Sequence, residues 1–259
     1  MSSVANPAGG YRYVPGIPPY SAGVLADEDM VIVRTTLSST IPWRAGFASI
    51  DEVLANANRP SQALCAVELR CAAPHSFDGF GSFNDDYRNE LDARGILLAE
   101  GVNPVARTNV APRHPTRLGG DEEHLFAFSF TVPRSAIGPT DTRPSFVIAG
   151  AGDLVDQADL RPESIVGGAA DWAATGEQRA EAVLDEIEAR LVALDLSWAA
   201  TDVAVVYSVE HVGAVLQSTV LPRLGEGGNR GTTWIHAEPP ITGLRFEMDA
   251  RGGVIERRG

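Results

Sequence analysis

An internal duplication is the feature that most constrains the fold of this chain. The run ARTNVAPRHP places Arg107 eight residues before Pro115, and the run NRGTTWIHAEPP places Arg230 nine residues before Pro239. Each run is followed by a second strand-like run, HLFAFSFTV or LRFEMDA. Because the two arginines lie 123 residues apart in a chain of 259, about half its length, we interpret the chain as one small fold written twice.

The second half gives the clearer pattern of elements. It predicts, in order, a strand over 144–150, a helix over 175–196, a strand over 202–209, a shorter helix within 211–225 that ends near Pro222, and strands over 232–237 and 244–250. Thr175 and Gln178 form a capping-box pattern at the start of the long helix. The order β-α-β-α-β-β predicts a mixed sheet with helices on one face.

The first half repeats this order with a weaker middle. It predicts strands over 30–37 and 63–72, a helix over 80–95, and strands over 106–112 and 124–132. Where the long helix is expected, residues 38–62 predict at best a short helical turn near 49–57. The stretch 133–144 contains three prolines and one glycine and is typical of a linker, so we predict domains at 10–138 and 139–259.

Composition excludes several classes of function. The net charge of −13 predicts repulsion of polyanions, so nucleic-acid binding is not expected. No apolar run approaches ~18 residues and no signal-peptide pattern opens the chain, so we expect a soluble cytoplasmic protein without membrane contact. All 21 basic residues are arginine, which excludes a Walker A loop and lysine Schiff-base chemistry and favours bidentate carboxylate binding. A biased genome also explains the absence of lysine.

No metal or cofactor site is predicted. The five histidines lack metal-ligand spacing, and Cys65 and Cys71 do not form a C-x-x-C pair, so we expect both to be buried thiols. Gly150 and Gly152 follow an apolar strand as in a dinucleotide fingerprint, but Val155 occupies the third glycine position. No helix start follows to receive a pyrophosphate, so a dinucleotide site is not expected.

The order of short motifs resembles the YjgF/RidA superfamily of reactive-intermediate deaminases. IPPYSAGVLADEDMVIV places Tyr20 and Ser21 at a GPYS-type turn, and FGSFNDDY is similar to a family helix of the type F-x-x-x-N-x-x-Y. RTNVAPRHP and RGTTWIHAEP are similar to the strand that the family's substrate-binding arginine opens, and FEMDA places Glu247 at its acidic position. The resemblance covers nearly the whole chain as two tandem copies.

This resemblance implies an α+β chain of two tandem chorismate-mutase-like domains, each a mixed β-sheet with helices packed on one face. It also implies a homo-oligomer, a trimer or a multiple of three. The family hydrolyses enamines and imines and releases ammonia without a cofactor. For this chain the implied partner is therefore a small carboxylate substrate.

The first copy departs from the family pattern at its acidic residue. It keeps Tyr20 and Arg107, but Ala127 or Ser129 stands where the glutamate is expected. The resemblance therefore implies a degenerate first domain in which Arg107 binds substrate.

The second copy departs at its tyrosine. It keeps Arg230 and Glu247, while Thr140 stands at the tyrosine position. These complementary losses predict a composite site, in which Tyr20 of one domain faces Arg230 and Glu247 of another. Arg230 would bind the substrate carboxylate and Glu247 would orient a water and take its proton.

Three further residues are candidates for the pocket. Trp234 and His236 follow Arg230 at strand period and share its face, so we expect them to line the pocket. Asp153 ends a predicted strand and is a candidate for the pocket rim. Each candidate also has a structural interpretation: a surface ion pair for the arginines, an exposed strand position for Glu247, and packing against the sheet for Tyr20, Trp234 and His236.

Three functions compete at this point. The first is an enamine or imine deaminase that acts on an unsaturated amino dicarboxylate, such as the 2-aminomuconate of aromatic-ring degradation. The second is a chorismatase-like hydrolase of a carboxylated enol ether, since those proteins also resemble two such domains. The third is a non-catalytic module that binds a carboxylated metabolite.

Overall fold

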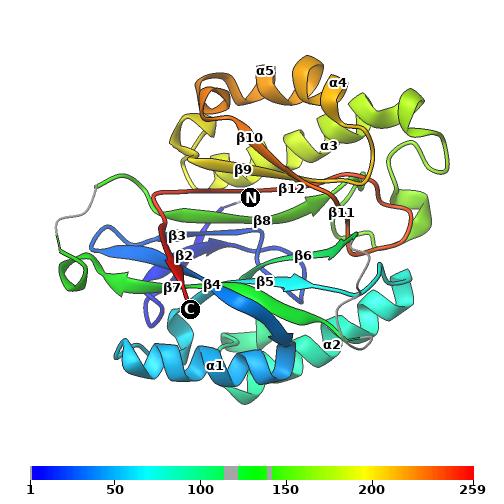
Figure 1. The fold of residues 1–259 in the computed structure, drawn as a ribbon. Helices are drawn as coiled ribbons and strands as arrows, with labels where there is room; N and C mark the ends of the chain where they lie inside the picture. The colour runs from blue at the N-terminus through cyan, green and yellow to red at the C-terminus, as the bar shows by residue number, and fades with distance from the viewer. Residues whose placement is uncertain (1, 114–121, 139–141) are drawn as a thin grey trace.

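Two mixed sheets pack against each other, with helices on both outer sides (Figure 1). The structure is a computed structural model that describes residues 2–113, 122–138 and 142–259. Pro115 and Thr140, and the first residue of the predicted second domain, lie outside these ranges. In Figure 1 the helices α1 and α2 cover one sheet, and α3, α4 and α5 cover the other.

The first sheet has the strand order β11-β6-β5-β7-β4-β13. Its central elements are β4 (Met30–Pro42), α1 (Trp43–Asn56), β5 (Leu64–Arg70), α2 (Phe77–Ala93), β6 (Ala106–Pro112) and β7 (His124–Pro133). β5 runs parallel to β6 and antiparallel to β7. The predicted strands and the predicted second helix of this half are confirmed within a few residues.

The second sheet has the strand order β1-β2-β3-β8-β12-β9-β10. Its later elements are β8 (Phe146–Gly152), α3 (Trp172–Ala193), β9 (Val203–Tyr207), α4 (Gly213–Val215), α5 (Leu221–Leu224), β10 (Thr232–Ile235) and β12 (Glu247–Gly252). A π-helical segment joins α4 to α5. The order β10-β9-β12-β8 repeats the order β6-β5-β7-β4 of the first sheet, with the parallel pair in the same place.

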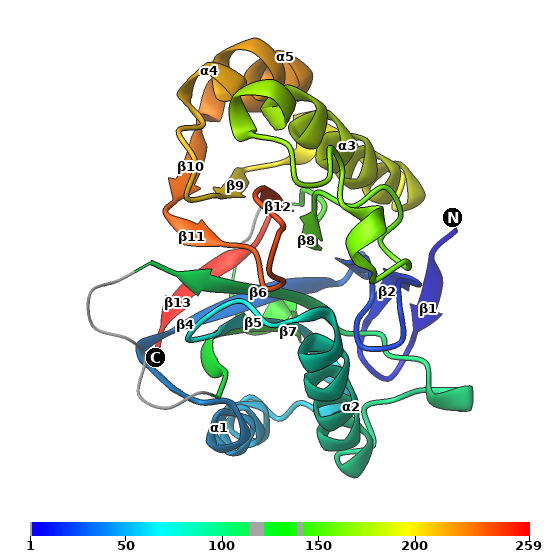
Figure 2. The same cartoon turned by 90° about the vertical axis from the view of Figure 1, so that its right-hand side faces the viewer.

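The two sheets exchange strands across the middle of the chain. β1 (Val4–Asn6), β2 (Tyr11–Val14) and β3 (Gly23–Ala26) join the second sheet, because β3 pairs with β8. In return, β13 (Ile255–Arg258) pairs with β4 and β11 (Ala237–Glu238) pairs with β6 (Figure 2). The sheets therefore do not follow the predicted division at 138/139, and each half of the chain supplies edge strands to the other.

The expectation of only a short turn near 49–57 is wrong, because α1 has 14 residues. Pro42 precedes the helix, where its missing N–H has no intrahelical partner to lose. Trp43, Phe47, Ile50 and Leu54 are buried at helical spacing against the sheet. This apolar stripe outweighs the low helix propensity of Gly46, whose lack of a side chain lets α1 lie close to β7.

The structure also describes the two cysteines and the apolar content of the helices. Cys65 and Cys71 are buried free thiols, and burial raises the pKa of Cys71 to about 12. Among the described residues, none of the helices combines the length and apolar content needed to cross a bilayer.

Candidate active site

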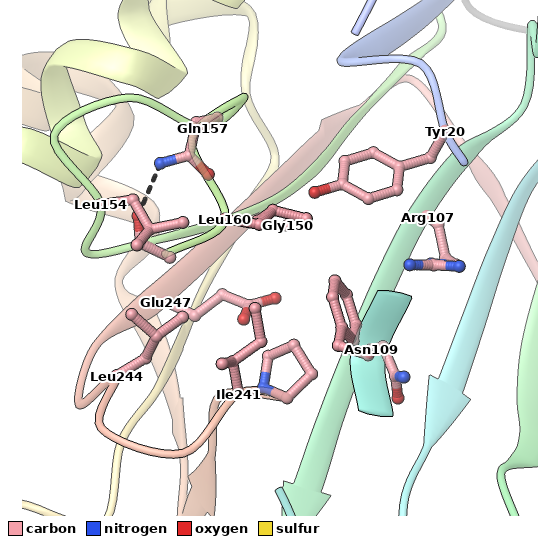
Figure 3. Close-up of a pocket in the computed structure, with 13 residues that line it drawn as sticks. Tyr20, Arg107, Asn109, Gly150, Leu154, Gln157, Leu160, Ile241, Leu244 and Glu247 are labelled. Carbon is pink, nitrogen blue, oxygen red and sulfur yellow. Dashed lines mark hydrogen bonds between the residues drawn. The ribbon is translucent and has the colours of Figure 1, made fainter. Parts of the chain in front are cut away.

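A small pocket lies where the two halves meet, and both contribute to its lining (Figure 3). Tyr20 and β6 form one wall, β8 and Glu247 form another, and apolar residues of the 154–160 and 240–244 segments close it. The space open to a water-sized molecule is about 30 Å³. Of the predicted site residues, the structure brings Tyr20, Arg107 and Glu247 together here.

Arg107 is a buried cation without an acidic partner among the residues that the structure describes. It is the second residue of β6, and its Nη2 donates a 2.6 Å hydrogen bond to Asn84 Oδ1. Its Nη1 makes no hydrogen bond to any residue that the structure describes. Burial lowers the pKa of this arginine below its usual value, although a guanidinium remains charged at neutral pH. The free Nη1 and the uncompensated charge make the site ready for an anion.

Aromatic rings enclose the guanidinium. Its carbon lies 4.8–5.4 Å from the ring centroids of Tyr20, Phe80, Phe83 and Tyr87. Helix α2 presents three of these rings and Asn84 on one face, because their spacing follows the helical repeat. The F-x-x-x-N-x-x-Y motif therefore builds the cage that holds Arg107. Cation–π attraction compensates part of the hydration that the guanidinium loses.

Asn109 is a site residue that the sequence did not single out. It lines the pocket two residues after Arg107, on the same face of β6. Neither its Nδ2 nor its Oδ1 has a hydrogen-bond partner among the residues described, although both are buried. Unpaired buried amides are costly, so this side chain is suited to a polar ligand. Its position at strand period from Arg107 was the available signal.

Glu247 supplies the acid of the site from the second half. It is the first residue of β12 and is 3% exposed, and its carboxyl group forms no hydrogen bond or ion pair within the described part of the chain. Burial, reinforced by the charges of Asp249 and Asp153, holds the pKa of this carboxyl well above its usual range. Such a group holds its proton at a higher pH than an exposed glutamate and can act as a general acid and then as a base.

Gly150 makes room for this carboxyl group. A Cβ added at position 150 would collide with Glu247 Oε1, and the carboxyl group reaches over this glycine into the pocket (Figure 3). Gly152 also lines the pocket. The two glycines of the G-x-G pattern, at the end of β8, are thus part of this site.

Arg230 lies elsewhere, contrary to the expectation that it faces Glu247. Its side chain is 43% exposed, and its Nη1 donates a 2.8 Å hydrogen bond to the carbonyl of Thr201. Asp202, which follows Thr201, donates its backbone N–H to the carbonyl of Arg251. Arg251 lies four residues after Glu247 on β12, a distance of ~13 Å along a strand. The physical reason is position, because Arg230 precedes β10 by two residues whereas Arg107 lies within β6.

Trp234 and His236 are also outside the pocket lining. Trp234 is 39% exposed, packs edge-on against His211, and donates its indole N–H to the carbonyl of Ser208. His236 is exposed, and its carbonyl accepts a hydrogen bond from the backbone of Arg113. Trp234 lies in β10, at the edge of the second sheet, and His236 directly follows this strand; both side chains are exposed.

Asp153 has a positioning role instead of a place at the rim. It is fully buried and ion-paired with Arg179, and it accepts hydrogen bonds from the backbone N–H groups of Arg245 and Phe246. These residues directly precede Glu247. Asp153 therefore fixes the start of β12 relative to the end of β8.

Comparisons of this sequence with known proteins identify one family. Residues 3–257 match the family model described as 2-aminomuconate deaminase CnbZ. The chain belongs to this CnbZ family. It is similar to a 2-amino-5-chloromuconate deaminase of Comamonas testosteroni, with 36% identity over 250 residues, 96% of this chain and 95% of that protein.

Solved structures resemble this CnbZ-family chain more distantly. A chorismatase has a TM-score of 0.51 and 13% identity over 97% of this chain and 79% of its own, which shows a likeness of fold alone. A YjgF-family protein of Neisseria meningitidis, with a TM-score of 0.25 over 49% of this chain and 98% of its own and 17% identity, is too dissimilar to inform the fold. Within the described residues, no group of three or more His, Cys, Asp or Glu side chains is placed to hold a metal ion.

Proposed function

We propose that this protein is a hydrolytic deaminase of a small unsaturated amino dicarboxylate of the 2-aminomuconate type. The observation that carries the proposal is the pairing of an unneutralised buried guanidinium, Arg107, with a carboxyl group of raised pKa, Glu247, in one pocket. Membership of the CnbZ family and the likeness to an aminomuconate-type deaminase support it.

The reaction consumes one water and releases one ammonia. A proton added to a carbon of the enamine converts it into an iminium ion, and water then adds to the carbon that carries nitrogen. One proton of this water moves to nitrogen, which leaves as ammonia, and the other returns to the group that protonated carbon, so that a 2-oxo dicarboxylate forms. The chemistry needs a positioned substrate and a group that gives and takes protons.

The residues of the pocket divide these tasks. Arg107 is proposed to hold the carboxylate next to the reacting carbon through charge-assisted hydrogen bonds from Nη1. Glu247 is proposed to donate the first proton as a neutral acid and then, as a carboxylate, to take a proton from the attacking water. Asn109 and Tyr20 would orient the amino group and the water.

Both sides of the proposed site come from one chain. Tyr20 and Arg107 belong to the first half and Glu247 to the second, so the pocket forms without another subunit. Assembly as a trimer or a multiple of three is therefore a separate proposal, as is a cytoplasmic location.

Ammonia release from freshly generated 2-aminomuconate tests the function. We expect ammonia and 2-oxo acid in equal amounts, formed much faster than in buffer. Release no faster than in buffer would contradict the proposal. Chorismate followed for pyruvate in a parallel assay tests the hydrolase alternative, and ligand binding without turnover would identify a binding module.

A further inference from the structure

A second, larger cavity adjoins the pocket. Its volume is about 290 Å³, roughly ten times that of the inner pocket, and Tyr20 and Gln157 line both spaces. Gln157 is held in this shared wall by a 2.8 Å hydrogen bond from its Nε2 to the carbonyl of Gly152. A six-carbon dicarboxylate is longer than a water-sized space, so a ligand held by Arg107 must extend beyond the inner pocket.

Arg190 is the cation of this second cavity. It lies near the end of α3, lines the cavity, and has a side chain that is only 2% exposed. Its Nη1 donates to the carbonyls of Ala149 and Gly150, at 2.9 and 3.2 Å, and its Nε donates to Glu186. The hydrogen bonds of this guanidinium to described residues come from Nη1 and Nε, and Nη2 makes none. The guanidinium is thus fixed in place with one edge unused.

The two arginines lie on either side of the reacting centre. The guanidinium carbon of Arg107 lies 4.9 Å from the ring centroid of Tyr20, and Arg190 lines the adjoining cavity together with Tyr20. Gly150 connects Glu247 to Arg190, because it lies against the carboxyl group of Glu247 and its carbonyl accepts a hydrogen bond from Arg190 Nη1. A ligand that passes between Tyr20 and Gln157 can therefore meet both guanidinium groups.

We propose that Arg190 recognises the second carboxylate of the substrate, which lies in the adjoining cavity beyond Tyr20 and Gln157. Arg107 then holds one end of an extended dicarboxylate and Arg190 the other, with the reacting carbon beside Glu247. This inference rests on the proposed function for the identity of the ligand. It assigns dicarboxylate specificity to a residue of α3 that carries none of the motifs noted in the sequence.

The negative charge of Glu186 opposes binding of a second carboxylate, so its removal gives a second test of the inference. It pairs with Arg190 Nε at 2.8 Å and lines the same cavity. Asp156 also lines it, but this residue is exposed and its carboxylate is engaged by the backbone N–H of Ala158. Removing the charge of Glu186 should therefore strengthen binding of a second carboxylate, whereas removing Arg190 should weaken it.

A matched pair of unreactive ligands tests the inference. Trans,trans-muconate and sorbate share a six-carbon diene and one carboxylate, and sorbate has a methyl group in place of the second. Dissociation constants are measured by calorimetry for the wild type, Arg190→Gln, Glu186→Gln and, as a control for charge, Arg44→Gln on the exposed side of α1. We expect the wild type to prefer muconate by about tenfold or more, since hydrogen bonds to a charged group have that effect.

The ratio of the two constants decides the outcome. Arg190→Gln should bring muconate to the affinity of sorbate and leave sorbate unchanged, Glu186→Gln should raise the preference, and Arg44→Gln should not alter it. An unchanged ratio in Arg190→Gln, or in Glu186→Gln should the first variant fail to fold, overturns the inference. Because no turnover is measured, this failure is distinguishable from that of the deaminase proposal.

Discussion

Arg107 and Arg230 stand in similar sequence motifs but in opposite environments. Arg107 is 3% exposed, is enclosed by aromatic rings and has no acidic partner within the described ranges. The side chain of Arg230 is 43% exposed, and its Nε lies 3.7 Å from Asp202 Oδ1. Besides the position of each arginine relative to its strand, the neighbouring helix differs. In the first half the 17-residue α2 presents rings to the arginine, whereas the second half has short helices around a π-helical segment.

The acidic residue shows the reverse difference. Glu247 begins β12 opposite Tyr207, the last residue of β9. The corresponding residue of the first half is His124, which begins β7 opposite Arg70, the last residue of β5, and not Ala127 or Ser129 as expected from the sequence. The first half has therefore kept the cation and the second half the acid. Because both face one pocket, we interpret the duplication as a division of labour that leaves a single proposed site.

Replacing Glu247 tests the acidic side of this comparison and should have the largest effect. Glu247→Gln removes the proposed proton donor and acceptor, so we expect kcat to fall by about 10² to 10⁴. Binding of muconate should persist. The control is Glu226→Gln, an exposed residue remote from β12 in the sequence. Turnover within a few-fold of wild type would exclude Glu247 from the chemistry.

Substitutions of Asp153 and Arg107 should have different effects on the stability of the protein. Asp153→Asn leaves the buried Arg179 without its counter-charge, so the free energy of unfolding in urea should fall by about 3–5 kcal/mol. Arg107→Gln removes a buried charge that has no acidic partner among the described residues. Relief from burying this charge offsets the lost contacts, so the free energy of unfolding should change by less than about 1 kcal/mol. Equal losses in the two variants would show that Arg107 has a structural role.

Gly150 tests the fit between β8 and Glu247. Gly150→Ala puts a methyl group against Oε1 and displaces the carboxyl group, so kcat/KM should fall by up to about 10²-fold. Gly81→Ala on α2 is the matched control, since an added Cβ meets no atom within 4 Å there. Wild-type kinetics in Gly150→Ala would mean that Glu247 does not need its present position.

The pH dependence of stability tests the protonation of Glu247. Its pKa is higher in the folded protein than in the unfolded chain, where it is about 4.3, so folding retains a proton. This contribution is fully present below the unfolded pKa and is lost as the pH rises through the folded pKa. Relative to Glu247→Gln, the wild type should therefore lose stability from about pH 4.3 upward in urea titrations. A constant difference, or one of opposite sign, would contradict the raised pKa.

Local sequence patterns predicted much of the fold but only part of the candidate site. The strands around Arg107 and Glu247 and the helix with Phe80, Asn84 and Tyr87 follow from periodicity and motif order. Arg230 illustrates the limit, because a shift of two residues relative to a strand moves a side chain out of a pocket without changing the motif. Asn109 could have been found from its strand spacing to Arg107, whereas the place of Arg190 depends on how α3 packs against the rest of the fold, which no single segment encodes.

Parallel kinetics of Arg107→Gln and Arg230→Gln test the central claim most directly. We expect kcat/KM for 2-aminomuconate to fall in Arg107→Gln by an amount equivalent to roughly 2–5 kcal/mol, the usual loss for a buried charged hydrogen bond. Arg230→Gln should remain within about twofold of wild type, as is usual for exposed residues. A large loss in Arg230→Gln with wild-type kinetics in Arg107→Gln would contradict a single site built around Arg107 and Glu247.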